Sequence, residues 1–234
     1  MPAKPVPSAE EMLAALHAQA NPAAVAGMAR FGVNPANTLG LSMPALRAMA
    51  RGIHSHALAL ELWQSGLHEA RILAALVEDP RQVTPQQMDA WVAELDSWDV
   101  CDQVCFGLFD RTPYADEKIH AWAAREEEFV RRAAFSTLAG LAIHAKNRPD
   151  ADFEQFFPLI LAAAADERNF VKKAVNWALR QIGKRSPQAR QAAIACAGQI
   201  LASAPNAAAR WVARDALREL NSANLRNSNE AHAS

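Results

Sequence analysis

Residues 129–132, 170–173 and 211–214 read Phe-Val-Arg-Arg, Phe-Val-Lys-Lys and Trp-Val-Ala-Arg. Each stretch sets an aromatic residue before a valine and a cation three positions after the aromatic, and 41 residues separate each stretch from the next. Self-similarity at a fixed period is typical of chains built from stacked structural repeats. The period therefore indicates a repeat architecture before any single helix is considered.

A period of about 40 residues is that of HEAT and armadillo repeats, in which helix pairs stack into a curved solenoid with a long concave face. Composition agrees, because the chain is rich in Ala, Leu, Arg, Glu and Gln and holds nine glycines and one tyrosine in 234 residues. We predict an all-α fold, a HEAT-like α-α superhelix. It forms one domain over residues 1–221, followed by a polar, disordered tail over 222–234.

Short apolar blocks separated by proline and glycine predict helix pairs joined by tight turns. Thr84-Pro85 and Ser186-Pro187 place an N-cap type residue before a proline at the first helical position, which predicts helix starts at both sites. Three tryptophans lie on apolar helical stripes, so we assign them to packing: Trp63, Trp91 and Trp122.

Charge is unevenly distributed along the chain, although the formal net charge is −1. Residues 1–128 hold 9 Lys and Arg against 17 Asp and Glu, whereas residues 166–220 hold 10 against 4. A basic C-terminal half can attract a polyanion, but it also suits contact with an acidic protein or a plainly solvated face.

Cys101, Cys105 and Cys196 give an odd number of cysteines and no disulfide framework, which is typical of a reducing compartment. We expect small buried side chains there. Cys101 and Cys105 lie four apart on a helix but lack further ligands at metal-binding spacing, so we predict no metal site. Because there is no long apolar run and no secretory pattern at the start, we predict a cytoplasmic protein that does not associate with membranes.

The repeats place Arg132, Lys173 and Arg214 at equivalent positions. A row of cations in register along a concave groove can follow a phosphate backbone. The simpler alternative is that each cation ends a buried stripe with a solvated residue. The spacing alone leaves both open.

Two further tryptophans have polar neighbours at helical spacing. Trp98 and Asp102 are four apart and share a helix face, and a carboxylate beside an indole is unusual for a core. Trp177 is followed one and two turns later by Arg180 and Lys184, and an aromatic among cations suits contact with a nucleic-acid strand.

At these residues the chain resembles the bacterial AlkD-type DNA alkylation repair glycosylases, which are built from HEAT-like repeats. The resemblance extends over nearly the whole chain. It is carried by residues 28–32, 39–40, 98–102, 130–134 and 170–184, and most specifically by Trp98/Asp102, Arg132 and Trp177/Arg180 in this order.

The resemblance implies a monofunctional DNA glycosylase that excises N3- and N7-alkylated purines from duplex DNA, without a metal or organic cofactor and without flipping the damaged base. It implies a catalytic cleft formed by Trp98, Asp102 and Trp177, with Arg132, Arg180 and Lys184 holding phosphates near the lesion. We expect a monomer, associated with the nucleoid when bound to DNA. Lys173, Arg214 and Phe31 are further candidate DNA contacts.

The chain departs from the family pattern at two positions. Phe31 stands where relatives have a tyrosine, so a hydroxyl contact to DNA is lost, and Gly140 stands eight residues after Arg132 in place of a lysine. Whether Lys146 takes over that role is open. These departures and the low net charge bear on affinity and lesion range more than on fold.

Plainer interpretations stand beside the catalytic one. Asp102 can be a helix-face carboxylate paired with Arg132 or another cation, Trp98 a partly buried packing residue, and Lys173 a solvent-facing lysine. Asp99 is a weaker catalytic candidate because it lies one position off the Trp98 face. At the level of the protein, the alternatives are a non-catalytic HEAT-like module that binds distorted or branched DNA and a HEAT-type protein-interaction scaffold.

Overall fold

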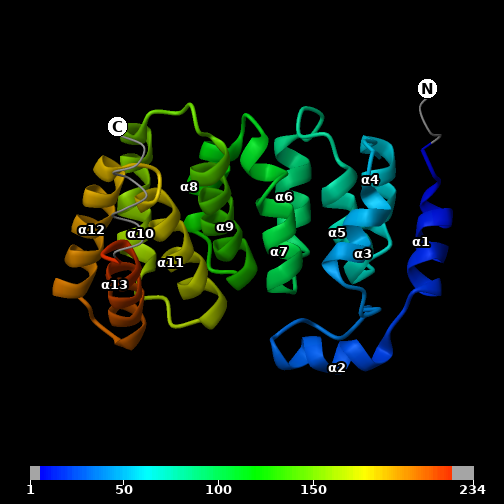
Figure 1. The fold of residues 1–234 in the computed structure, drawn as a ribbon, viewed down its shortest axis with the longest axis horizontal. Helices are drawn as coiled ribbons and strands as arrows, with labels where there is room; N and C mark the ends of the chain where they lie inside the picture. The colour runs from blue at the N-terminus through cyan, green and yellow to red at the C-terminus, as the bar shows by residue number, and fades with distance from the viewer. Residues whose placement is uncertain (1–5, 223–234) are drawn as a thin grey trace. The chain divides into compact units, whose positions relative to one another are not determined.

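The computed structural model describes residues 6–222, and all regular elements in that range are helical (Figure 1). The chain divides into two compact units, Met1–Thr112 and Pro113–Ser234, which are described separately. The tail predicted for residues 222–234 lies outside the described residues except for Ser222, and the single domain over 1–221 stays a prediction.

The first unit is built around α5, which packs against α3, α4 and α7. Its helices are α1 (Ala9–Ala18), α2 (Pro22–Arg30), α3 (Met43–Ala50), α4 (His56–Gln64), α5 (His68–Val77), α6 (Pro85–Ala93) and α7 (Trp98–Cys105), followed by the 3-10 helix η1 (Phe109–Arg111).

The second unit consists of three helix pairs, and the second helices of the pairs, α9, α11 and α13, pack against one another in chain order (Figure 1). Its elements are α8 (Ala115–Ala123), α9 (Glu128–His144), the 3-10 helix η2 (Asp150–Phe156), α10 (Phe157–Ala163), α11 (Asn169–Gly183), α12 (Pro187–Ala202) and α13 (Ala207–Leu220).

The 41-residue period corresponds to these pairs. The repeated valines are all buried: Val130, Val171 and Val212. The preceding aromatics meet between repeats, because the rings of Phe129 and Phe170 stack with their centroids 5.7 Å apart. Phe129 and Phe170 are thus the second residues of α9 and α11, whereas Trp211 lies about one turn further into α13.

Several local predictions are confirmed. Thr84 and Ser186 are N-caps whose hydroxyls accept hydrogen bonds from the backbone N–H groups three residues later. Trp63 and Trp91 are buried and stack with ring centroids 4.1 Å apart. Trp122 is also buried, and so are the three cysteines.

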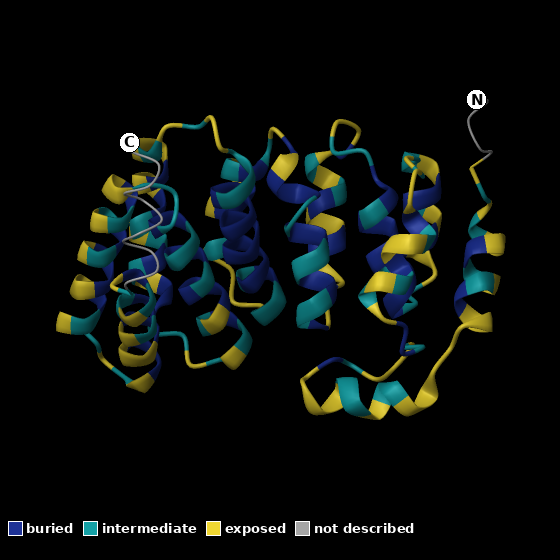
Figure 2. Cartoon of the chain, in the orientation of Figure 1, coloured by how far each residue is buried: buried dark blue, intermediate teal, exposed yellow. Residues whose placement is uncertain are grey.

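α2 differs from the other helices because none of its nine residues is buried (Figure 2). Its start is fixed by the N–H of Asn21, which donates to the carbonyl of Leu39 at 2.7 Å. Gly40 makes this approach possible: it has a φ of +86°, and a Cβ there would lie 2.3 Å from the carbonyl oxygen of Asn21. The segment 31–41 thus returns the chain from α2 to the body of the unit.

None of the helices within residues 6–222 combines the length and the apolar character needed to cross a membrane.

Candidate nucleic-acid interface and catalytic residues

α7 carries the predicted pair Trp98 and Asp102. Its inner face is fully buried and consists of Val100, Cys101, Val104 and Cys105. Trp98 and Asp102 are half-buried and lie one turn apart. The first unit therefore presents an indole and a carboxylate together on the partly open side of one helix.

The indole of Trp98 is held by the segment 31–41. Its Nε1 donates to the carbonyl oxygen of Phe31 at 3.0 Å. Beside it, Asn34 donates from its backbone N–H to the hydroxyl of Ser97 at 2.9 Å and from its side-chain amide to Asp96 at 2.6 Å. The position of Trp98 is consequently coupled to a segment more than 60 residues earlier in the chain.

Phe31 is the most exposed large apolar side chain among the described residues, at 76%. It follows directly on α2, as the C-cap of that helix. The carbonyl oxygen of Phe31 accepts a hydrogen bond from the indole of Trp98, while the ring of Phe31 faces solvent. The two aromatic residues therefore belong to one local structure. The sequence predicts both as site residues but does not predict their connection.

The first turn of α5 holds this local structure in place. Glu69 is fully buried, and its carboxylate accepts hydrogen bonds from the backbone N–H groups of Leu39, Gly40 and Leu41, the shortest at 2.7 Å from Gly40. Three hydrogen bonds from backbone N–H groups offset the free-energy cost of removing this carboxylate from water. Glu69 thus fixes the end of the segment 31–41.

His68, the preceding residue, fixes the start of α7. Its Nε2 lies 3.0 Å from a carboxylate oxygen of Asp99, and its backbone N–H donates to Asn37 at 2.9 Å. Burial acts to lower the pKa of His68. The hydrogen bond and the negative charge of Asp99, together with the charges of Glu69 and Asp96, outweigh burial, so the pKa is raised above its ordinary value of 6.5. The carboxylate of Asp99, a weaker catalytic candidate, is therefore engaged by a buried histidine.

Neither His68 nor Glu69 belongs to a motif from which the site was predicted. A signal was present, since His-Glu opens a helix, HEARILAALV, whose other residues are apolar except Arg71. Two adjacent ionisable residues at the buried start of a helix indicate polar partners elsewhere in the fold.

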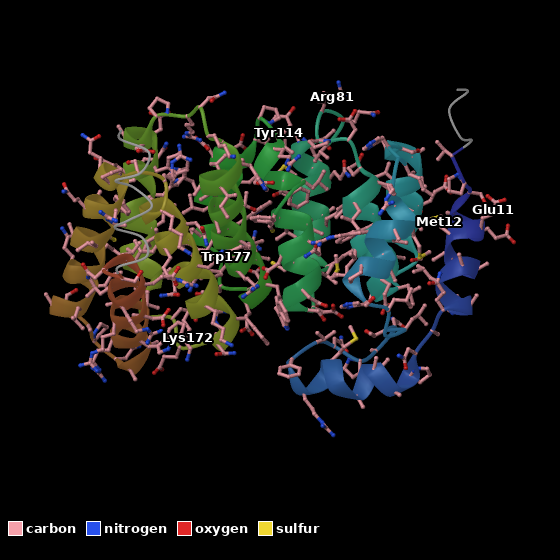
Figure 3. The ribbon with its side chains drawn as sticks, in the orientation of Figure 1. Glu11, Met12, Arg81, Tyr114, Lys172 and Trp177 are labelled. Atoms are coloured by element: carbon pink, nitrogen blue, oxygen red, sulfur yellow. The ribbon has the colours of Figure 1, made fainter. Side chains whose placement is uncertain are left out.

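α11 carries the predicted site residues Lys173, Trp177 and Arg180, and Lys184 is its C-cap; Figure 3 labels Trp177. Trp177 is half-buried and Lys173, one turn earlier, is exposed. Arg180 and Lys184, predicted to hold phosphates, both form ion pairs with Glu219 of α13. Burial acts to raise the pKa of Glu219, but the two cations outweigh it and lower that pKa.

The three repeat-equivalent cations differ in environment. Arg132 is buried, with 5% of its surface exposed, and its Nη1 donates to the carbonyl of Phe170 at 2.6 Å. Lys173 and Arg214 are exposed. The contact from Arg132 joins α9 to α11, so this residue also serves the packing of successive repeats.

Aromatic and cationic side chains meet at the start of α13 as well. Trp211 is 38% exposed, and the ammonium of Lys172 lies 5.7 Å from the centroid of its ring. Lys172 and Trp177 thus lie on the same helix, and Lys172 reaches toward the next repeat (Figure 3).

Within residues 6–222, no cluster of three or more His, Cys, Asp or Glu side chains is arranged to hold a metal ion. Cys196 is a free buried thiol, and burial raises its pKa to about 12.

Comparison with known proteins relates this arrangement to DNA repair. The model of a family described as DNA alkylation repair enzyme matches residues 12–220. A solved structure with 17% sequence identity superposes with a TM-score of 0.72, covering 82% of this chain and 83% of that one. It represents a family of proteins related to the HEAT-like repeat DNA glycosylases with affinity for branched DNA structures. No curated protein sequence matches the chain. The fold is therefore all-α and HEAT-like, as the repeat spacing predicts.

Proposed function

Because the chain belongs to the family of DNA alkylation repair enzymes, we propose that it is a monofunctional DNA glycosylase. Its substrates are purines that carry an alkyl group on N3 or N7 in duplex DNA, and it hydrolyses their N-glycosidic bond without flipping the damaged base. The observation that carries the proposal is the pair on α7, an indole and a carboxylate one turn apart and both partly open to solvent.

The chemistry explains why a carboxylate suffices. Alkylation at N3 or N7 makes the purine cationic, so the base leaves without being protonated. Positive charge then develops on the deoxyribose as its bond to the base breaks. The anionic carboxylate of Asp102 stabilises this charge and orients the attacking water, which is electrostatic catalysis by a preorganised group. In this reaction no metal or organic cofactor takes part.

The indoles supply the surfaces around the reacting sugar. Trp98 and Trp177 present ring faces that are electron-rich and attract an electron-poor sugar or a cationic base. Trp98 is suited to this role because its Nε1 is already engaged with Phe31, which fixes the plane of the ring. The exposed ring of Phe31 contacts DNA through its apolar surface, without the hydroxyl that a tyrosine would bring.

Cations of the second unit bind the backbone. Lys173 and Arg214 are exposed and available for phosphates. Arg180 and Lys184 share Glu219, so they hold a phosphate with part of their charge already compensated. We propose Arg132 as a phosphate contact near the lesion, and its bond to the carbonyl of Phe170 also fixes the start of α11.

Base release tests the proposal. The full chain is incubated with duplexes that contain N7-methylguanine or N3-methyladenine, and the free base is quantified under single-turnover conditions. Asp102→Asn is expected to lower the rate by about 10²- to 10³-fold, the usual effect of removing one electrostatic contact to a transition state. Glu61→Gln, on the exposed side of α4, is the matched control and leaves the rate unchanged. An inactive wild type, or an Asp102→Asn variant as fast as wild type, contradicts the proposal.

A second candidate is a non-catalytic module that binds distorted or branched DNA. The affinity for branched DNA described for the structural neighbour's family favours it. Tight binding of a four-way junction over a linear duplex, together with no release of base from either lesion, would select this function over the first.

A further inference from the structure

A hollow of about 580 Å³ lies in the second unit, at the C-terminal ends of α9 and α11. Its polar lining consists of Lys146, Arg148, Asp150, Gln181, Lys184 and Arg185. The volume falls within the range of ligand sites in proteins. Four cations and one carboxylate in one hollow indicate an anionic ligand, provided that the protein does not neutralise all four itself.

Two of the cations form a fixed wall. Arg185 pairs with Asp150 at 2.9 Å and donates to the carbonyls of Ala142 and Arg148 at 2.7 and 2.6 Å. Arg148 in turn donates to both carboxylate oxygens of Asp116, each at 2.7 Å. These guanidinium groups are fully engaged and need no ligand. They shape the hollow, and Arg185 satisfies the carbonyl of Ala142 in the last turn of α9.

The other two cations are less compensated. Lys184 shares the carboxylate of Glu219 with Arg180, which also lies 3.9 Å from a carboxylate oxygen of Asp215. Lys146 is exposed, and among residues 6–222 its ammonium has no ion-pair partner. The side-chain amide of Gln181 likewise has no hydrogen-bond partner within the described part of the chain. An uncompensated ammonium beside a free amide donor matches the needs of one phosphate group.

The hollow continues the face of α11 that the proposed function uses. Gln181 and Lys184 lie one and two turns after Trp177. From Lys173 to Lys184 the helix rises roughly 16 Å at about 1.5 Å per residue. One strand of B-DNA places a phosphate about every 3.4 Å of its axis. A strand that follows this face therefore brings to the hollow a phosphate about five nucleotides from the one at Lys173.

We propose that this hollow is a binding site for one phosphate group, contacted by Lys146, Gln181 and Lys184, and that the backbone of bound DNA supplies this phosphate at a distance from the lesion. The inference rests on the proposed function for its DNA, and it assigns the site to anchoring rather than to catalysis.

The salt dependence of binding to an undamaged duplex tests the site. Association constants of wild type, Lys146→Ala and Gln181→Ala are measured by fluorescence anisotropy over a range of salt concentrations. The slope of log K against log salt is negative, and loss of one phosphate contact reduces its magnitude by about 0.9. Lys146→Ala is expected to show this decrease, while Gln181→Ala weakens binding at each salt concentration and leaves the slope unchanged. Arg111→Ala, which removes an exposed cation from η1, is the control and leaves the slope of the wild type.

An unchanged slope in Lys146→Ala, with its fold intact by circular dichroism, would overturn the proposal. A calorimetric titration with inorganic phosphate separates the sources of the ligand. Suppose that inorganic phosphate binds only when Lys146 is present, but that Lys146→Ala leaves the salt dependence of DNA binding unchanged. That result would show that the phosphate bound in the hollow does not come from the DNA backbone. Because the duplex carries no lesion, the slope reports on the site even if the protein releases no base. Failure of the glycosylase proposal is thus distinguishable from failure of this one.

Discussion

Replacing Glu69 with glutamine tests whether the segment 31–41 depends on a buried charge. The carboxylate accepts three backbone N–H groups with no exposed surface. Glutamine has the same shape and keeps one acceptor oxygen, but it is neutral and places an amide donor where the second oxygen faces Leu39. The change therefore alters the charge and one contact while leaving the volume constant.

The expected cost follows from the hydrogen bonds. A bond to a charged acceptor contributes about 1.5–3 kcal/mol and a neutral one about 0.5–1.5 kcal/mol. Three bonds that each lose about 1 kcal/mol give a destabilisation of about 3 kcal/mol. Since about 1.4 kcal/mol corresponds to a factor of ten, the amides of Leu39, Gly40 and Leu41 should exchange roughly 100-fold faster with solvent.

Native-state hydrogen exchange on these three amides is the assay, with urea unfolding as a second measurement. Glu61→Gln on α4 makes the same chemical change at an exposed position and serves as the control. Because the segment also supplies the carbonyl that holds Trp98, Glu69→Gln should slow base release under the proposed function. Unchanged protection of all three amides in Glu69→Gln would refute the assignment of Glu69 as their anchor.

The interaction between His68 and Asp99 makes the free energy of unfolding depend on pH, because the pKa of His68 is raised in the folded protein. The stabilisation from this interaction is complete below pH 6.5 and is lost as the pH rises through the raised pKa. Urea midpoints of the wild type should fall over that range, whereas those of His68→Gln should stay nearly level, and parallel curves would contradict the prediction. Gly40→Ala should destabilise more than Gly52→Ala, because both glycines have a positive φ but only a Cβ at Gly40 meets the carbonyl of Asn21. Backbone strain alone costs about 1–3 kcal/mol, so equal losses in the two variants, measured by thermal unfolding, would show that the close approach does not matter.

Much of the fold was predictable because its signals are local or periodic. The recurrence from Phe129 to Phe170 to Trp211 predicts the repeats, since equivalent residues must meet equivalent neighbours when helix pairs stack. The N-caps Thr84 and Ser186 are predictable from the residue and the proline that follows it. Such features require no knowledge of how distant segments pack.

The partners of the site residues were not predictable from local patterns. Arg180 and Lys184 are one helical turn apart, but their pairing with Glu219 depends on how α13 packs against α11. Arg132 has the same repeat position as Lys173 and still differs from it in burial. Periodicity predicts where a side chain lies on its helix, whereas its environment depends on the neighbouring helices.

The lack of buried residues in α2 has a consequence for engineering. The exposed positions of such a helix tolerate new side chains at little cost in stability, provided that Asn21 and Gly40 keep the chain entering and leaving at the same points. Residues 22–30 are therefore a natural position for grafting a different recognition helix next to Phe31, which would redirect the protein to other ligands while the rest of the scaffold stays unaltered.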